Sequence, residues 1–269
     1  MLGVRILSAI IAAAVIVPVV LWGGTIGVTV LVLICSSIGV WELSRNLPAI
    51  KTSPGKELTV TMAAVVVMAF AVLPAGSVPA IVVLFPLAVL LLHLFLYNVI
   101  ENTVDSTAQM IFVAAYVAIP LGHAVLLERM SQGAVWVLFV LVVICLGDAG
   151  AYFAGKFYGK HHFSVKISPG KTVEGLGGCV AGSFAGMVIM KIVCPSLPSL
   201  CVLSQLTLVL AVLGPLGDLC ASAIKRRLSI KDFGAVMPGH GGILDRADSL
   251  IPAFPATYYF LILSLNAVP

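Results

Sequence analysis

Three acidic residues in the C-terminal part of the chain have the types and spacing of a metal site that acts on phosphates. Asp245 and Asp248 are three positions apart, which sets both carboxylates on one side of a helical turn. Asp218 precedes them inside an apolar run, where an ionised side chain is costly. Several carboxylate oxygens suit a hard divalent cation such as Mg²⁺ better than zinc. The sequence therefore predicts that Asp218, Asp245 and Asp248 bind magnesium and take part in catalysis.

Basic residues accompany these acids along the chain. They are Lys225, Arg226, Lys231 and Arg246, with Lys166 and Lys171 available from the preceding polar segment. Acids alone would repel a phosphate, and bases alone would need no metal. The combination is typical of phosphoryl or nucleotidyl transfer, in which metal and cationic side chains neutralise charge that shifts during displacement. We assign Lys225 and Arg246 to catalysis and the other four to substrate binding.

Smaller residues beside these charges complete the predicted binding set. Ser222 and Lys225 follow Asp218 at four and seven positions, so the three share one stripe of a helix. Gly241 and Gly242 let backbone N–H groups approach an oxygen-rich ligand. We expect His240 to donate a hydrogen bond to phosphate or to support the glycine turn rather than to act as a general base.

A second intramembrane acid, Asp148, is also predicted to bind substrate. Tyr152, Gly155 and Gly159 follow it at steps of four, three and four, so small residues line one helical face where another helix or a ligand can come close. The later segment "SPGKT", residues 168–172, resembles the end of a P-loop but lacks the first glycine, because position 165 is Val165. It is either a plain turn or a phosphate contact through Ser168, Lys171 and Thr172.

The composition places these residues in a bilayer. Hydrophobic residues make up 61% of the 269 positions and charged residues only 10%, and the mean hydropathy is +1.16. A helix needs about 20 apolar residues to cross the hydrocarbon. Nine runs meet this pattern: 6–22, 25–42, 58–74, 78–99, 108–127, 133–155, 175–193, 203–224 and 249–267. We expect an all-α integral membrane protein with about nine transmembrane helices.

The distribution of basic residues predicts the orientation. Thirteen of the fifteen lysines and arginines fall at the N-terminus or in alternate loops on the same side. The positive-inside rule therefore places the N-terminus in the cytoplasm and the C-terminus outside, with the predicted chemistry on the cytoplasmic side. The net charge of +4 favours anionic lipid headgroups or an anionic substrate, and no soluble basic domain exists to bind nucleic acid.

Polar residues divide the chain into two regions. Residues 1–130 are a transmembrane scaffold, because their acids fall at or beyond span ends, and residues 131–269 are a catalytic region, because charge and glycine there enter the spans and loops. The six cysteines form no C-x-x-C pair and are expected to be packing residues. A zinc site with His161, His162 or His240 is the minor alternative.

One stretch carries a resemblance to a known family. Residues 222–248, "SAIKRRLSIKDFGAVMPGHGGILDRAD", resemble the signature of phosphatidate cytidylyltransferases, also called CDP-diglyceride synthases, at every polar position. Met237 and Ala247 depart from the usual residues but stay apolar. The segments "GDAGAYFAGKFYGK" and "ISPGKTVEG" are also similar to the family, with Gly170 where a second lysine is common, which leaves more of any phosphate contact to Lys171. The resemblance is strong over about 145–250.

The resemblance implies an activity and its partners. The reaction is transfer of CMP from CTP to phosphatidate, giving CDP-diacylglycerol and pyrophosphate in phospholipid biosynthesis. It also implies dependence on Mg²⁺, with K⁺ as a second ion, a homodimer, and a place in the bacterial inner (cell) membrane with the active site facing the cytoplasm. Asp148 would then orient the cytidine or a water molecule on the metal.

The sequence alone leaves other classes of protein open. A secondary transporter would use Asp148 and Asp218 to couple ions, although charge gathers on one side and no matched pair of interrupted helices appears in two halves. Another CTP-dependent lipid phosphotransferase, such as a lipid kinase, or a prenyl-phosphate sugar transferase would need similar contacts. A purely structural membrane protein is least consistent with buried acids.

Overall fold

The protein is helical throughout the part of the chain that the structure describes. The structure is a computed structural model and describes residues 2–51, 55–97, 103–164, 166–236 and 241–265. Over these residues it contains no strand beyond one isolated bridge between His162 and Thr172. The α-helices are α1 (Leu2–Trp22), α2 (Gly24–Ser44), α3 (Gly55–Val72), α4 (Val78–Tyr97), α5 (Thr103–Val113), α6 (Ile119–Glu128), α7 (Gly133–Tyr158), α8 (Val173–Val193), α9 (Leu200–Arg227), α10 (Leu244–Ala247) and α11 (Leu250–Leu265). The predicted all-α fold is confirmed.

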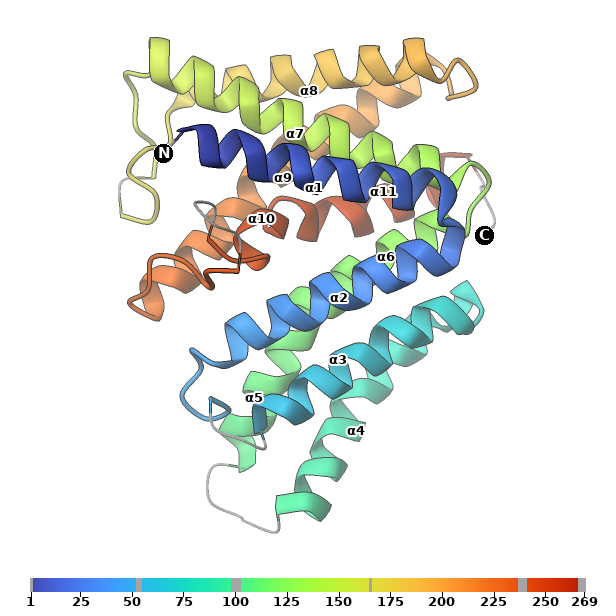
Figure 1. Cartoon of the computed structure of the whole chain (residues 1–269), viewed down its shortest axis with the longest axis vertical. Helices are drawn as coiled ribbons and strands as arrows, with labels where there is room; N and C mark the ends of the chain where they lie inside the picture. The colour runs from blue at the N-terminus through green and yellow to red at the C-terminus, as the bar shows by residue number, and fades with distance from the viewer. Residues whose placement is uncertain (1, 52–54, 98–102, 165, 237–240, 266–269) are drawn as a thin grey trace. The chain divides into compact units, whose positions relative to one another are not determined.

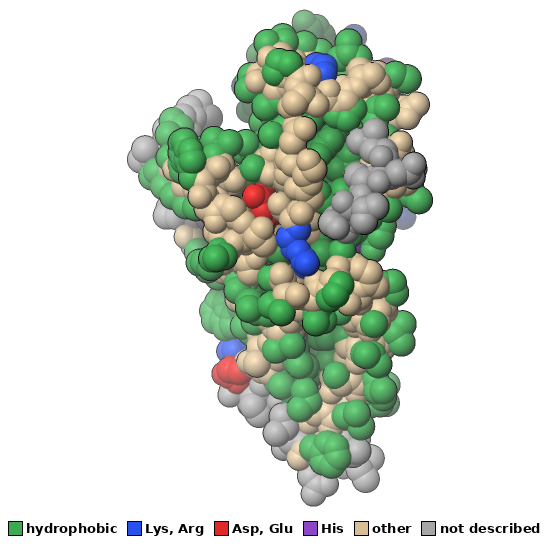
Figure 2. Space-filling view, turned by 90° about the vertical axis from the view of Figure 1, so that its right-hand side faces the viewer, with side chains coloured by type: hydrophobic (Ala, Val, Ile, Leu, Met, Phe, Trp, Pro, Cys, Tyr) green, Lys and Arg blue, Asp and Glu red, His purple; other side chains and the backbone are tan. Residues whose placement is uncertain are grey.

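Seven helical segments of the described chain are long and apolar enough to cross a bilayer. They are Gly24–Ser44, Gly55–Val72, Ala75–Leu92, Thr103–Glu128, Gly133–Tyr158, Val173–Val193 and Leu200–Arg227. Two shorter apolar helices, Ile10–Trp22 and Leu250–Ser264, correspond to the first and last predicted spans, so the number nine stays a prediction. Large side chains such as Ile26 and Leu263 are exposed, and hydrophobic side chains are spread over the face drawn in Figure 2, with few charged ones among them. This is the surface of a membrane protein, whose outer side chains meet lipid.

The helices form two compact units. The first unit contains residues up to Arg129 together with Asp232–Arg246, and the second contains Met130–Lys231 and Ala247–Val268. The division predicted at residue 130 falls beside this boundary. The segment 232–246, however, packs with the first unit although it carries much of the family signature.

The first unit is built around α2. Helices α1, α3 and α6 pack against it, and its buried face carries Val40 and Leu43. Helices α5 and α6 continue through a π-helical turn, Ala114–Ala118. Pro120 lies two residues after the end of this turn and has no N–H to donate to the carbonyl of Tyr116, so a local change of helical hydrogen bonding is expected there. The π turn is thus explained by the sequence.

The second unit is built around a close pair of antiparallel neighbours, α7 and α8, which lie side by side in Figure 1. A Cβ on Gly150 would collide with the carbonyl of Gly178, and one on Gly182 would collide with the carbonyl of Leu146. On the predicted face after Asp148, a Cβ on Gly155 would come within 3.3 Å of Oγ1 of Thr172 and 3.9 Å of Cα of Gly175, so the start of α8 lies against it. Helices α9 and α11 pack on this pair and on each other.

Candidate functional site

An ion pair between Lys171 and Asp218 is the centre of the polar cluster in the second unit. The Nζ atom of Lys171 lies 2.8 Å from Oδ2 of Asp218 and donates to the carbonyl of Pro215 at 3.0 Å. The hydroxyl of Ser222, one turn further along α9, donates to Oδ1 of Asp218 at 3.3 Å. Asp218 and Ser222 of the predicted stripe are therefore in contact on α9, and a loop lysine meets them. Side-chain exposures of 17% for Lys171 and 39% for Asp218 leave the pair accessible to a ligand.

Asp248 joins this cluster because α9 and α11 approach each other closely at Gly217. A Cβ on Gly217 would collide with the backbone carbonyl of Asp248 and with the ring of Pro252. Asp248 is buried, and its Oδ1 accepts the N–H of Ser249 at 2.8 Å. Burial, and then the nearby carboxylate of Asp218, raise the pKa of Asp248 to about 7.

Two further charges predicted from the sequence act on the same carboxylate. Asp148 on α7 raises the pKa of Asp248, whereas Lys225 on α9 lowers it. Asp148 on α7, Asp218 on α9 and Asp248 in the turn before α11 thus bring carboxyl groups into one region of the second unit. A bound cation would offset their charge, and an all-oxygen donor set fits a hard cation.

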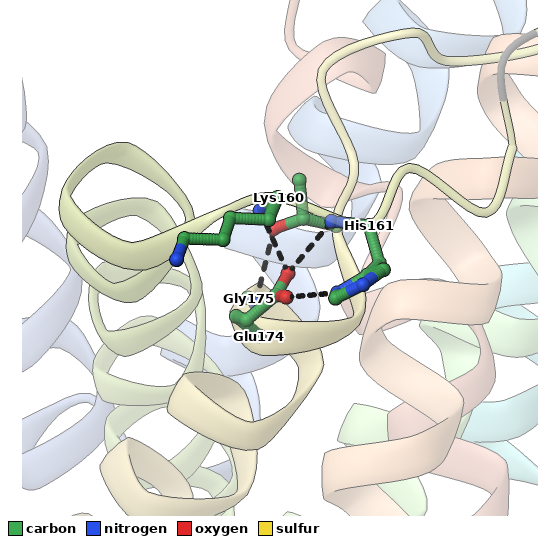
Figure 3. Close-up of polar contacts among 5 residues, drawn as sticks. Lys160, His161, Glu174 and Gly175 are labelled. Atoms are coloured by element: carbon green, nitrogen blue, oxygen red, sulfur yellow. Dashed lines mark hydrogen bonds and ion pairs between the residues drawn. The ribbon is translucent and has the colours of Figure 1, made fainter.

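The loop that supplies Lys171 is fastened at its base by Glu174 in the first turn of α8 (Figure 3). Its Oε2 accepts the N–H groups of Lys160 at 3.1 Å and His161 at 3.2 Å, and its Oε1 lies 2.6 Å from Nδ1 of His161. Thr172 caps α8 by accepting the N–H of Gly175 at 3.1 Å. Thr172 therefore serves the helix start, while Lys171 beside it is directed to Asp218.

Of the other predicted basic residues, Arg226 contacts this loop. Arg226 is exposed, and its Nε donates to the carbonyl of Ile167 at 3.2 Å, which ties the end of α9 to the loop. Lys166 and Lys231 are exposed. Their predicted contacts with substrate remain predictions.

Asp245 lies in the first unit, within the turn that it helps to build. Its Oδ2 accepts the N–H of Phe233 at 2.9 Å and that of Gly242 at 3.0 Å. Gly241 has a positive φ of 84°, which favours glycine. Arg246 is exposed on the same turn. His240 lies outside the described residues.

Of the three predicted magnesium ligands, Asp218 and Asp248 lie in the second unit and Asp245 in the first. Among the described residues, no group of three or more His, Cys, Asp or Glu side chains is close enough to form a metal site. Asp218 and Asp248 influence each other within the second unit, whereas Asp245 belongs to the first. The predicted three-aspartate ligand set remains a prediction. The six cysteines are free thiols.

Two residues that hold the polar segments in place are not among the predicted site residues. Glu174 fastens the loop of Lys171, and its position two residues after Thr172 is the signal of a helix start. Glu42 falls at the end of a predicted span, yet its side chain is fully buried and accepts hydrogen bonds from the signature turn. An acid at the end of an otherwise apolar run was the available signal.

The fold and this cluster define a helical membrane protein in which an ammonium group and carboxyl groups gather at one polar site. The chain matches the model of the cytidylyltransferase family over residues 3–264, and it therefore belongs to that family of nucleotidyltransferases. It is 35% identical to the phosphatidate cytidylyltransferase of Staphylococcus saprophyticus subsp. saprophyticus over 264 residues, 96% of this chain and 98% of that one. The proteins of the same name from Staphylococcus epidermidis and Staphylococcus aureus (strain COL) are each 33% identical, over 96% and 97% of this chain and 98% and 99% of their own.

Proposed function

We propose that this chain is a phosphatidate cytidylyltransferase, which transfers CMP from CTP to phosphatidate and yields CDP-diacylglycerol and pyrophosphate. Family membership and the names of full-length relatives support this activity. The observation that carries it at the level of atoms is the Lys171–Asp218 pair, with Ser222 and Asp248 beside it. A cationic group next to clustered carboxylates is what a metal-bound triphosphate requires.

The reaction needs positioning more than acid–base chemistry. A phosphate oxygen of phosphatidate forms a bond to the α-phosphorus of CTP, and the bond between the α-phosphorus and its bridging oxygen to the β-phosphoryl group breaks. Pyrophosphate leaves with that electron pair. Because the nucleophile is already an anion, no strong base is required, in keeping with a supporting role for His240.

The chain's own residues divide this work between cation binding and phosphate binding. Asp218 and Asp248 would hold Mg²⁺, and Asp245 is proposed as the third ligand because it lies three positions before Asp248. Bound there, the metal would neutralise phosphate charge. Lys171, which pairs with Asp218, would exchange this carboxylate for a phosphate oxygen as substrate enters. Lys225, Arg226, Lys231, Arg246 and Lys166 would bind phosphates of CTP and the lipid, with Ser222, Gly241, Gly242 and Asp148 as neutral or orienting contacts.

The location follows from the same chemistry. Phosphatidate presents its phosphate at headgroup depth and CTP comes from the cytoplasm, so we place the site at the cytoplasmic side of a bacterial inner membrane. The basic residues concentrated in alternate loops support this orientation. A homodimer and K⁺ as a second ion belong to the same proposal.

Labelled CTP separates this activity from its alternatives. Purified protein with phosphatidate and Mg²⁺ should move label from the α-phosphate of CTP, but not from the γ-phosphate, into the lipid. Transfer of the γ-label would instead indicate a lipid kinase, and a sugar transferase would leave both labels out of the lipid. Uptake into vesicles without turnover of CTP would favour a transporter.

The carboxylates can be tested by conservative changes. We expect Asp218→Asn and Asp248→Asn each to lower kcat/KM for CTP by about a hundredfold or more, because a neutral amide neither binds the cation nor pairs with Lys171 as strongly. Asp105→Asn, an exposed position in the first turn of α5, is the matched control and should retain activity. Full activity in either site variant would remove that residue from the proposed metal site.

A further inference from the structure

The buried carboxylate of Glu42 on α2 accepts hydrogen bonds from the turn that carries Asp245 and Arg246. Its Oε1 accepts the N–H of Ile243 at 3.2 Å and its Oε2 accepts the N–H of Leu244 at 3.0 Å. The side chain of Glu42 has no exposed surface. A buried carboxylate is stable only when its oxygens are well paired, so these bonds fix the turn firmly to α2.

Two glycines allow the backbone to approach this carboxylate. A Cβ on Gly234 or on Gly242 would collide with the carboxylate of Glu42. At these two positions glycine is therefore required by contact within the protein. The abundance of glycine in the signature segment has a structural cause here, since the chain wraps closely around a buried acid.

The end of α2 holds the other side of the same turn. Arg45 donates to the carbonyl of Phe233 at 3.0 Å, and Asn46 donates to it at 3.4 Å and to the carbonyl of Glu42 at 2.7 Å. Phe233 in turn donates its N–H to Asp245. A continuous set of hydrogen bonds thus runs from α2 through Phe233 to the Asp245 carboxylate, all within the first unit.

We propose that Glu42 is a positioning residue of the transfer reaction, and that it fixes the turn bearing Asp245 and Arg246 through the N–H groups of Ile243 and Leu244. This inference rests on the proposed function for its activity readout. Glu42 and Asp245 each accept two backbone N–H groups of this segment, four donors in all. Loss of one carboxylate leaves buried donors unpaired and frees the turn.

The test combines a structural and a kinetic measurement on the full-length protein in detergent. Glu42→Gln replaces one acceptor oxygen by an NH₂ group that faces a backbone donor. We expect faster hydrogen–deuterium exchange in a peptide spanning 232–246, with exchange in 200–227 unchanged. We also expect kcat/KM for CTP to fall by about tenfold or more, with a higher Mg²⁺ concentration for half-maximal rate. Glu57→Gln, at an exposed glutamate of α3, is the matched control for the same chemical change.

A second variant reaches the same contact from the other side. Gly234→Ala should displace the Glu42 carboxylate and reproduce both effects, whereas Gly76→Ala, where a Cβ meets nothing within 4 Å, should not. The double variant Glu42→Gln/Gly234→Ala should lose little more activity than either single variant, because both substitutions break the same interaction.

Two results would overturn the inference. One is unchanged hydrogen–deuterium exchange in 232–246. The other is an unchanged Mg²⁺ requirement together with a loss of activity that only matches the loss of folded protein. A wild-type protein inactive toward CTP and phosphatidate would refute the proposed function instead, and the exchange measurement would still decide whether Glu42 holds the turn.

Discussion

At the residue scale, Lys171 lies where its ammonium group can serve two partners. It contacts the carboxylate of Asp218 and the carbonyl of Pro215, and the turn formed by the N–H of Lys171 and the carbonyl of Ser168 fixes its backbone. An ammonium group held beside an accessible carboxylate can transfer to an incoming phosphate without a large rearrangement. Because position 170 is glycine and not a second lysine, Lys171 alone would supply the ammonium group of this loop that contacts phosphate.

Replacing Lys171 tests this role. Lys171→Met keeps a long side chain but removes the charge, and we expect kcat/KM for CTP to fall by about a hundredfold, because a cation next to the transferring group is lost. Steady-state kinetics with labelled CTP would measure it. Lys160→Met, at an exposed position of the same loop, should remain close to wild type. Equal kinetics for the two variants would contradict the assignment.

Binding of the cation itself should be visible without substrate. Asp148, Asp218 and Asp248 concentrate negative charge in the second unit, so we expect Mg²⁺ alone to raise the unfolding temperature of the purified protein. At about a hundred times its dissociation constant the ion would stabilise the folded state by roughly 2.7 kcal/mol. The shift should disappear in Asp248→Asn and persist in Asp105→Asn. An undiminished shift in Asp248→Asn would place the cation elsewhere.

At the element scale, the α7–α8 pair fixes the loop of Lys171, because that loop joins the two helices. Their close approach depends on glycine at defined positions, whereas a neighbouring glycine of α8 has no such role. A Cβ on Gly178 would collide with Ala154 and with the carbonyl of Gly150, but one on Gly177 meets nothing within 4 Å.

These adjacent glycines give a matched pair of variants. Gly178→Ala should lower the free energy of unfolding by about 1–3 kcal/mol, because the helices must separate to admit a methyl group. Gly177→Ala should be neutral or stabilise the helix by about 0.5–1 kcal/mol. Thermal unfolding in detergent compares them directly. Equal destabilisation by both variants would show that α7 and α8 do not pack as the structure places them.

At the scale of the whole molecule, the orientation in the bilayer decides which compartment supplies CTP. Nine crossings with a cytoplasmic N-terminus require an external C-terminus, and the basic loops predict that arrangement. We expect alkaline phosphatase fused to the C-terminus to be active in a bacterial host, and the same enzyme inserted at the loop around Lys51 to be inactive. An inactive C-terminal fusion would mean an even number of crossings or the opposite orientation.

The sequence by itself determined the class of fold and the chemistry. Apolar runs near 20 residues long dictate helices in a bilayer, because backbone polar groups must be satisfied internally there, and the signature at 222–248 identified the family. The stripe of Asp218 and Ser222 also followed from helical periodicity, which is a local property.

Only the tertiary structure decided which distant residues meet. Lys171 pairs with Asp218 across 47 positions of the chain, and Glu42 binds the N–H of Leu244 across 202 positions. Helical periodicity relates residues a few positions apart, so it cannot predict contacts between segments. For the same reason the sequence assigned Glu42 to a scaffold, whereas packing of the signature turn on α2 makes that acid part of the machinery.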